Sequence, residues 1–166
     1  MKKRKKIMLV ILLIIIIPIL TIFTIRYFKY KKNIDDIKTI KISNYNGYLS
    51  PSNEYIIDFD KNLVTYNYTY FNQSNEDNQY SSRNFTKEDA EYFIEKANLY
   101  GFFNWKKSYK TKHGGNDLPY TYISIIYKND DIQIIDCYNA YPLNYDKMGE
   151  VLYEAFGYDI FLIFTY

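Results

Sequence analysis

Few residues of the chain combine the types and the spacing that enzyme chemistry requires. His113 is the single histidine, and Asp117 follows it after two glycines and an asparagine. A histidine beside a carboxylate can act as a general acid or base. The chain has no G-x-S-x-G nucleophile elbow that would supply a serine to such a pair. The glycines favour a flexible loop, and an enzyme that uses His113 remains an alternative.

A second candidate is the segment 58–62, which reads D-F-D-K-N and matches the first ligand positions of a calcium-binding loop. The match then ends. Leu63 stands where that loop requires glycine, and Thr69 stands where it requires a bidentate glutamate. The same residues suit a polar turn between two strands. We therefore predict a hairpin turn at 60–62 and no metal site.

Cys137 and a short aromatic segment complete the candidates. Cys137 is the only cysteine, so no disulfide can form within the chain, and we expect a small residue half-buried in a strand. Phe102, Phe103 and Trp105 would form either a platform that stacks on a sugar or an aromatic plug in the core, and the plug is favoured. The sequence thus predicts no catalytic, cofactor-binding or metal-binding residue, and no cofactor.

The charges divide the chain into a basic end and an acidic domain. Residues 1–32 hold nine of the 21 lysines and arginines and no acidic residue. Residues 33–166 hold the other 12 basic residues and all 19 acidic residues, a net charge of −7. An acidic domain repels phosphate backbones, so we do not expect nucleic acid as a partner.

Residues 7–25 form an uncharged, apolar segment of the length that a membrane helix needs. As a helix it would be about 28 Å long, close to the ~30 Å hydrocarbon core of a bilayer. The segment lacks the small-residue site of a cleaved signal peptide, and membrane helices tolerate a proline such as Pro18. We therefore expect a transmembrane signal anchor that contacts the lipid bilayer.

This anchor sets the predicted organisation of the chain. The basic end, 1–6, carries more positive charge than the stem after the anchor, so the positive-inside rule places the N-terminus in the cytoplasm. A basic and polar linker, 26–36, then leads to one extracytoplasmic domain, 37–166. The sequence predicts a single-pass protein of the cell membrane with its domain outside.

Strand signals recur through the domain. Apolar residues in alternation or in short runs predict strands at 38–43, 54–59, 63–70, 120–127 and 132–138. The last two carry isoleucines on both faces, so we expect central strands that are covered on two sides. The polar segment 72–84 predicts an exposed loop. Most of the 21 tyrosines are expected to be ordinary strand residues.

Capping residues and helical spacing predict two helices. Thr86 and Asp89 occupy the capping-box positions of the first helix, which Gly101 ends. The second helix runs from Asn144, its N-cap, to Gly157. The segment 139–142 that precedes this helix could shape a binding edge, but a turn is the favoured interpretation. Leu143 and Met148 occupy the hydrophobic-staple positions of the second helix.

The predicted element order is β-β-β-α-β-β-α. Residues 160–164 form either a last edge strand or a tail packed on the core. This order predicts an α+β fold with a mainly antiparallel sheet and two helices packed on it, in addition to the N-terminal transmembrane helix.

Three parts of the chain resemble one family. They are Y-I-I-D-F-D at 55–60 with V-T-Y at 64–66, T-K-E-D at 86–89 with F-F-N-W at 102–105, and I-S-I-I-Y at 123–127 with N-A-Y-P at 139–142. Together they cover most of residues 38–157, and they resemble a family of short bacterial secreted or membrane-anchored domains of unknown function. These motifs consist of turn and packing residues. The resemblance therefore implies the α+β fold and its topology only, and it brings no assigned activity.

Three classes of function are compatible with these features. The anchor, the acidic tyrosine-rich sheet and the missing catalytic set favour a non-enzymatic module that binds or shields an envelope ligand or a protein. A membrane-tethered immunity or inhibitor protein is one alternative, since such proteins are often acidic and lack catalytic residues. An envelope-directed enzyme that uses His113 is the other, and the sequence favours a non-enzyme over it.

Overall fold

The computed structural model describes residues 12, 14–18, 21, 31–45, 52–72, 75–111 and 119–161, and of 70–72 and 75–78 the backbone alone. The chain divides into two compact units, Met1–Lys31 and Lys32–Tyr166. In the first unit, the described residues 12, 14–18 and 21 are helical. Within the described residues, no helix is both long enough and apolar enough to cross a membrane. Most of the predicted anchor, 7–25, lies outside these residues.

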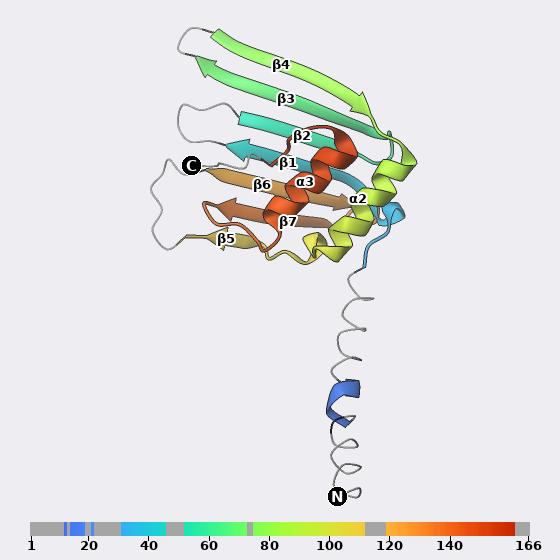
Figure 1. Cartoon of the computed structure of the whole chain (residues 1–166). Coiled ribbons are helices and arrows are strands. Elements are labelled where there is room, and N and C mark those ends of the chain that lie inside the picture. The colour runs from blue at the N-terminus through green and yellow to red at the C-terminus, as the bar shows by residue number, and fades with distance from the viewer. Residues whose placement is uncertain are drawn as a thin grey trace, which may run out of the picture. The chain divides into compact units, whose positions relative to one another are not determined.

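The described part of the second unit is a seven-stranded sheet with helices α2 and α3 on one face (Figure 1). The strands are β1 (Ile37–Tyr45), β2 (Ser52–Asp58), β3 (Leu63–Asn72), β4 (Asn75–Asn84), β5 (Ser108–Lys110), β6 (Tyr120–Tyr127) and β7 (Ile132–Tyr138). The helices are α2 (Lys87–Leu99), α3 (Tyr145–Phe156) and the short 3₁₀ helices η1 (Ile34–Asp36) and η2 (Phe102–Asn104). The strand order is β4-β3-β2-β1-β6-β7-β5, and only the β5–β7 pair is parallel. The predicted α+β class with a mainly antiparallel sheet is confirmed.

Two strands were not predicted, so the element order is β-β-β-β-α-β-β-β-α. The prediction of an exposed loop at 72–84 is wrong, because residues 75–84 form β4 and pair with β3 along its whole length. An edge strand with polar residues on both faces has no apolar alternation that would reveal it. The strand β5 is too short to show a pattern, and it pairs with a strand far along the sequence.

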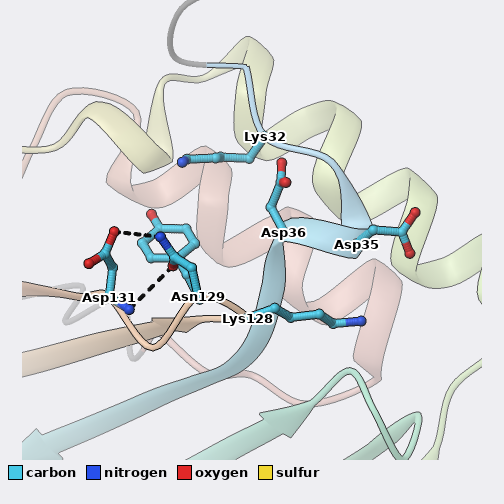
Figure 2. Close-up of a pocket in the computed structure, with 7 residues that line it drawn as sticks. Lys32, Asp35, Asp36, Lys128, Asn129 and Asp131 are labelled. Carbon is cyan, nitrogen blue, oxygen red and sulfur yellow. Dashed lines mark hydrogen bonds between the residues drawn. The ribbon is translucent and has the colours of Figure 1, made fainter.

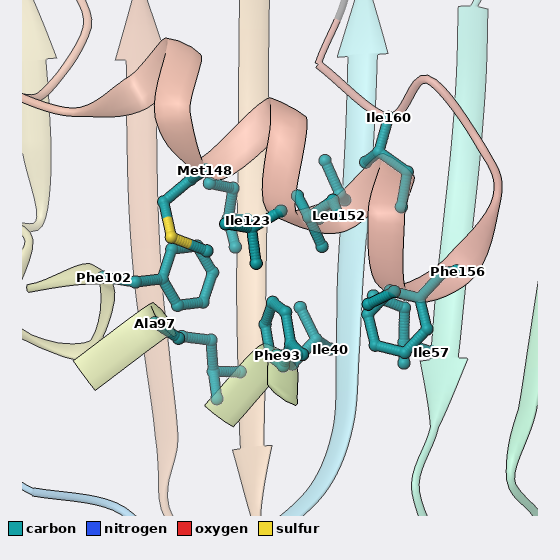
Figure 3. Packing of buried hydrophobic residues seen from close by; sticks show 14 of the residues in the cluster. Ile40, Ile57, Phe93, Ala97, Phe102, Ile123, Met148, Leu152, Phe156 and Ile160 are labelled. Atoms are coloured by element: carbon teal, nitrogen blue, oxygen red, sulfur yellow. The ribbon is translucent and has the colours of Figure 1, made fainter. Parts of the chain in front are cut away.

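The core lies between the two helices and the covered face of the sheet (Figure 3). Fully buried side chains from three strands meet fully buried aromatic residues of both helices: Ile40, Ile57 and Ile123, with Phe93 and Phe156. Phe102, Phe103 and Trp105 are at most 8% exposed, which confirms the predicted aromatic plug. Burial of such side chains contributes roughly 1.5–3 kcal/mol each, and this packing fixes the helices on one face of the sheet.

The predicted capping box of α2 is confirmed. The Thr86 hydroxyl accepts a hydrogen bond from Asp89 N at 3.1 Å, and Thr86 N donates to Asp89 Oδ2 at 2.9 Å. Gly101 follows the helix with φ +72°, a left-handed conformation that glycine adopts without strain. The side chain of Asp89 and the end glycine thus define where α2 begins and stops.

The start of α3 differs from the prediction in one respect. Asn144 precedes the helix as expected, but its Nδ2 donates to Tyr100 O at 3.3 Å instead of capping α3. The backbone of Asn144 is left-handed, with φ +67°. Leu143 before it is 86% exposed, so the predicted staple between Leu143 and the buried Met148 is wrong.

The chain after α3 returns to the covered side of the sheet. Ile160 and Phe161 are fully buried and lie in no strand, as expected of a tail packed on the core. Asn44 Nδ2 donates to Ile160 O at 2.6 Å, and the Phe161 ring stacks on Tyr145 with 4.2 Å between centroids. Residues 162–164 of the predicted segment lie outside the described residues.

Candidate binding face

One face of the sheet carries no described helix. Figure 1 shows α2 and α3 on the same side, so the described helices cover β6 and β7 on one side only. The prediction that both strands are covered on two sides is wrong for this reason. Their second set of isoleucines faces outward: Ile126 and Ile134 are half-buried and Ile132 is 61% exposed. We call this side of the sheet the open face.

A row of three tyrosines crosses the open face. The strand register pairs Tyr45 of β1 with Tyr120 of β6, and Tyr120 with Tyr138 of β7. Side chains of directly paired residues lie on the same face of a sheet. The ring centroids are 5.8 Å apart for Tyr45 and Tyr120, and 5.9 Å apart for Tyr120 and Tyr138. We call these three residues the tyrosine row.

Hydrogen bonding fixes the middle ring of the row. The Tyr120 hydroxyl donates to Asp136 Oδ1 at 2.8 Å, and Asp136 N donates to Lys107 O at 2.9 Å. Burial and then the Asp136 carboxylate raise the pKa of the Tyr120 hydroxyl above its usual value near 10. The hydroxyl is a hydrogen-bond donor at neutral pH, and its bond to Asp136 orients the ring between its two neighbours.

The residues around the row make the open face amphipathic. Tyr45 is 48% exposed at one end of the row, and the register places Lys110 of β5 beside Tyr138 at the other. Lys41 Nζ and a Glu54 carboxylate oxygen form an ion pair at 2.5 Å on the same face. Rigid aromatic rings with polar tips are enriched in surfaces that bind other proteins.

A cavity of about 450 Å³ lies elsewhere, between η1 and the turn that joins β6 to β7 (Figure 2). Its lining mixes charges of both signs: Lys32, Asp35, Asp36, Tyr127, Lys128, Asn129 and Asp131. Lys32 Nζ lies 4.5 Å from the centroid of the Tyr127 ring, and Asn129 Nδ2 donates to Asp131 Oδ2 at 2.7 Å. Several of these polar groups interact with their own neighbours and the lining side chains converge on no single point, so the cavity is a weaker candidate than the open face.

The segment that resembles a calcium loop forms a hairpin turn, as predicted. The Asp58 carboxylate accepts hydrogen bonds from Asp60 N at 3.1 Å, Lys61 N at 3.0 Å and Lys61 Nζ at 2.8 Å. Asn62 takes the left-handed conformation that closes the turn. Among the residues that the structure describes, no group of three His, Cys, Asp or Glu side chains could hold a metal ion.

The remaining chemical candidates are buried or lie outside the described residues. Cys137 is fully buried beneath the helices, and burial, with the nearby Asp136 carboxylate, raises the pKa of its thiol to about 12. A thiol with this pKa is almost entirely protonated at neutral pH and is a poor nucleophile. His113 and Asp117 lie in the segment 112–118, outside the described residues.

The sequence predicts most of the tyrosines as ordinary strand residues and does not predict the tyrosine row. One signal could have revealed it. Two helices of about 10 Å diameter cover about one face of a sheet of five predicted strands that lie about 4.8 Å apart. Apolar residues on both faces of 120–127 and 132–138 therefore indicate that one apolar surface of these strands has no helix over it. The row itself depends on the pairing of β1 with β6, which are far apart in the chain.

The comparisons with known proteins identify no relative of this chain. The chain matches no family model, and no curated protein or solved structure matches it significantly. The resemblance to bacterial anchored domains therefore stays a prediction, and functional inference depends on the geometry of the open face.

Proposed function

We propose that the domain is a non-catalytic module that binds a protein through its open face. The observation that supports this most strongly is the tyrosine row, three adjoining rings on the side of the sheet that carries no described helix. Tyrosine loses little side-chain entropy on binding and offers a large apolar area together with a hydroxyl. Such residues at the centre of an interface commonly dominate its binding energy.

The rigidity of this face favours binding over a merely structural role for the rings. Tyr120 is held by Asp136, and the strands beneath are fixed by the core on the other side of the sheet. A surface that is already ordered has less conformational entropy to lose when a partner binds. The exposed Tyr45 and the half-buried Tyr138 would then flank a preformed centre.

The charge of the domain indicates the kind of partner. Residues 33–166 hold 12 basic and 19 acidic residues, so a positively charged protein is attracted and a negatively charged one is repelled. A basic protein is also the expected target of an acidic immunity or inhibitor protein. That alternative is thus a specific case of the same proposal, in which binding blocks the partner's activity.

The N-terminal segment completes the proposal. Residues 7–25 form a signal anchor, with 1–6 in the cytoplasm and the domain on the outer side of the cell membrane. Support comes from the uncharged apolar sequence and the greater positive charge before it. Protease added to intact cells should then digest the domain, and the protein extracted from membranes should have a mass that includes residues 1–25. A domain that resists digestion until the cells are lysed would overturn this orientation.

Site-specific photo-crosslinking tests the binding face. A benzoylphenylalanine replaces Tyr45 on the open face, or Tyr153 on α3 as a control of similar exposure, 48% against 59%. The full-length variants are irradiated in the cells that make the protein. We expect a discrete adduct from position 45 that is absent from position 153, and a captured protein with net positive charge. Adducts of equal yield at both positions, adducts with lipid or glycan, or no adduct would overturn the proposal.

A further inference from the structure

The strand β4 forms one edge of the sheet over ten residues (Figure 1). Its inner side pairs with β3 from Asn75 to Asn84, and no described element pairs with its outer side. An edge of this length presents a row of backbone donors and acceptors that another strand can satisfy. β4 contains no proline that would interrupt such pairing.

The hydrogen bonds at the end of β4 show which of its residues point outward. Phe85 N donates to Asn62 O at 3.0 Å, one step beyond the pairing of Asn84 with Leu63. In an antiparallel ladder, residues alternate between pairs that exchange hydrogen bonds and pairs that do not. Odd-numbered residues of β4 therefore bond to β3. The backbone groups of even-numbered residues, such as Tyr80 and Ser82, point away from the sheet.

We propose that a second copy of this chain pairs with β4 in antiparallel orientation, about a two-fold axis that passes through Tyr80. This proposal is independent of the tyrosine row. A two-fold axis perpendicular to the sheet keeps the helices of both copies on the same side of the combined sheet. Residues that pair directly across the new edge must then have their side chains on the same face. With Tyr80 paired to Tyr80 of the second copy, position 78 pairs with Ser82, so even-numbered residues, whose backbone groups point outward, pair with even-numbered residues.

Charge complementarity selects this register. With the axis at Tyr80, position 77, an aspartate in the sequence, lies opposite Arg83 of the second copy, and symmetry makes this pairing occur twice. The Arg83 guanidinium lies against Gly157 in the single chain, so the pairing requires this side chain to turn toward the edge. With the axis moved to Gln79, Arg83 lies opposite an asparagine and position 77 opposite a serine. Tyr80, which is 69% exposed in the single chain, would be covered by its symmetry mate. The self-complementary register indicates a second copy as the occupant of this edge.

Cysteine crosslinking on the full-length chain in detergent solution tests this register. In Tyr80→Cys, the two cysteines would be about 5.5 Å apart between Cα atoms, within the range of a disulfide. In Ser82→Cys, the two cysteines would be displaced along the strands by about 13 Å, beyond that range. Tyr153→Cys, on α3, is the control for disulfides that form by random collision. The native Cys137 is fully buried, so it is not available for crosslinking.

Mild oxidation and non-reducing electrophoresis separate the outcomes. We expect a disulfide-linked dimer from Tyr80→Cys, with Ser82→Cys and Tyr153→Cys remaining monomeric. A Tyr80→Cys variant that forms no more dimer than Tyr153→Cys would overturn the proposal. Equal dimer from Tyr80→Cys and Ser82→Cys would overturn it as well, because the register would then be wrong. Circular dichroism of each variant checks that the fold is retained.

Discussion

The Tyr120 hydroxyl donates a hydrogen bond to Asp136 Oδ1 at 2.8 Å, and this contact ties the middle of the tyrosine row to β7. A half-buried hydrogen bond to a carboxylate stabilises the fold, and its removal leaves the carboxylate with one donor fewer. The same contact orients the ring that Tyr45 and Tyr138 flank. Stability and the shape of the open face are therefore coupled at one residue.

Replacement of Tyr120 by Phe removes this hydrogen bond while it keeps the ring. We expect the free energy of unfolding to fall by about 1 kcal/mol. The measurement is equilibrium unfolding in urea. Tyr122→Phe, on the same strand and the same face, is the matched control and should change stability by a few tenths of a kcal/mol at most. A Tyr120→Phe variant as stable as the wild type would show that the bond contributes nothing.

Alkaline pH should destabilise the domain. Burial raises the pKa of Tyr120 above 10 and that of Tyr127 to about 12, whereas an unfolded tyrosine ionises near 10. Above pH 10 the unfolded chain loses protons that the folded chain keeps, so stability falls as the pH rises. Below pH 10 these residues give no pH dependence. Unfolding free energies measured from pH 8 to 11 check this, and Tyr120→Phe should reduce the slope.

The capping box of α2 offers a test of local stability away from the open face. Thr86→Ala removes the acceptor for Asp89 N and should lower the free energy of unfolding by about 1 kcal/mol. Thr86→Ser keeps the hydroxyl and should retain most of the stability. Urea unfolding of both variants distinguishes the cap from a general effect of substitution at this position, which would affect both alike.

Cys137 should be inert in the folded protein. Its thiol is fully buried and its pKa is raised to about 12, so a thiol reagent at neutral pH meets neither a thiolate nor an accessible sulfur. We expect no labelling of the native protein with Ellman's reagent, and one thiol per chain after denaturation. Rapid labelling of the native protein would show that this part of the core opens.

Much of the fold was predictable because its signals are local. The bounds of β6 and β7, the hairpin turn after Asp58 and the capping box at Thr86 follow from residues that lie close together in the sequence. Each of these elements buries one apolar stripe or closes one turn. Such features depend on residues within a few positions of one another, so they can be predicted without knowledge of the long-range contacts.

The features that could not be predicted depend on strands that pair although they are far apart in the sequence, or on a sheet face that no described helix covers. β4 is polar on both faces, so its strand character comes from pairing with β3 rather than from apolar alternation. β5 pairs in parallel with β7, which no local pattern encodes. The tyrosine row exists only because β1 lies beside β6. Candidate sites built across strands in this way appear only in three dimensions.

The central claim is tested most directly by the dissociation constant between the crosslinked partner and variants of the tyrosine row. Wild type, Tyr45→Ala and the control Tyr153→Ala are compared by isothermal titration calorimetry in the same buffer. The account predicts that Tyr45→Ala weakens binding by about tenfold or more, since it removes an aromatic anchor, whereas Tyr153→Ala leaves the dissociation constant unchanged. Equal dissociation constants for all three proteins would contradict the assignment of the open face as the binding surface.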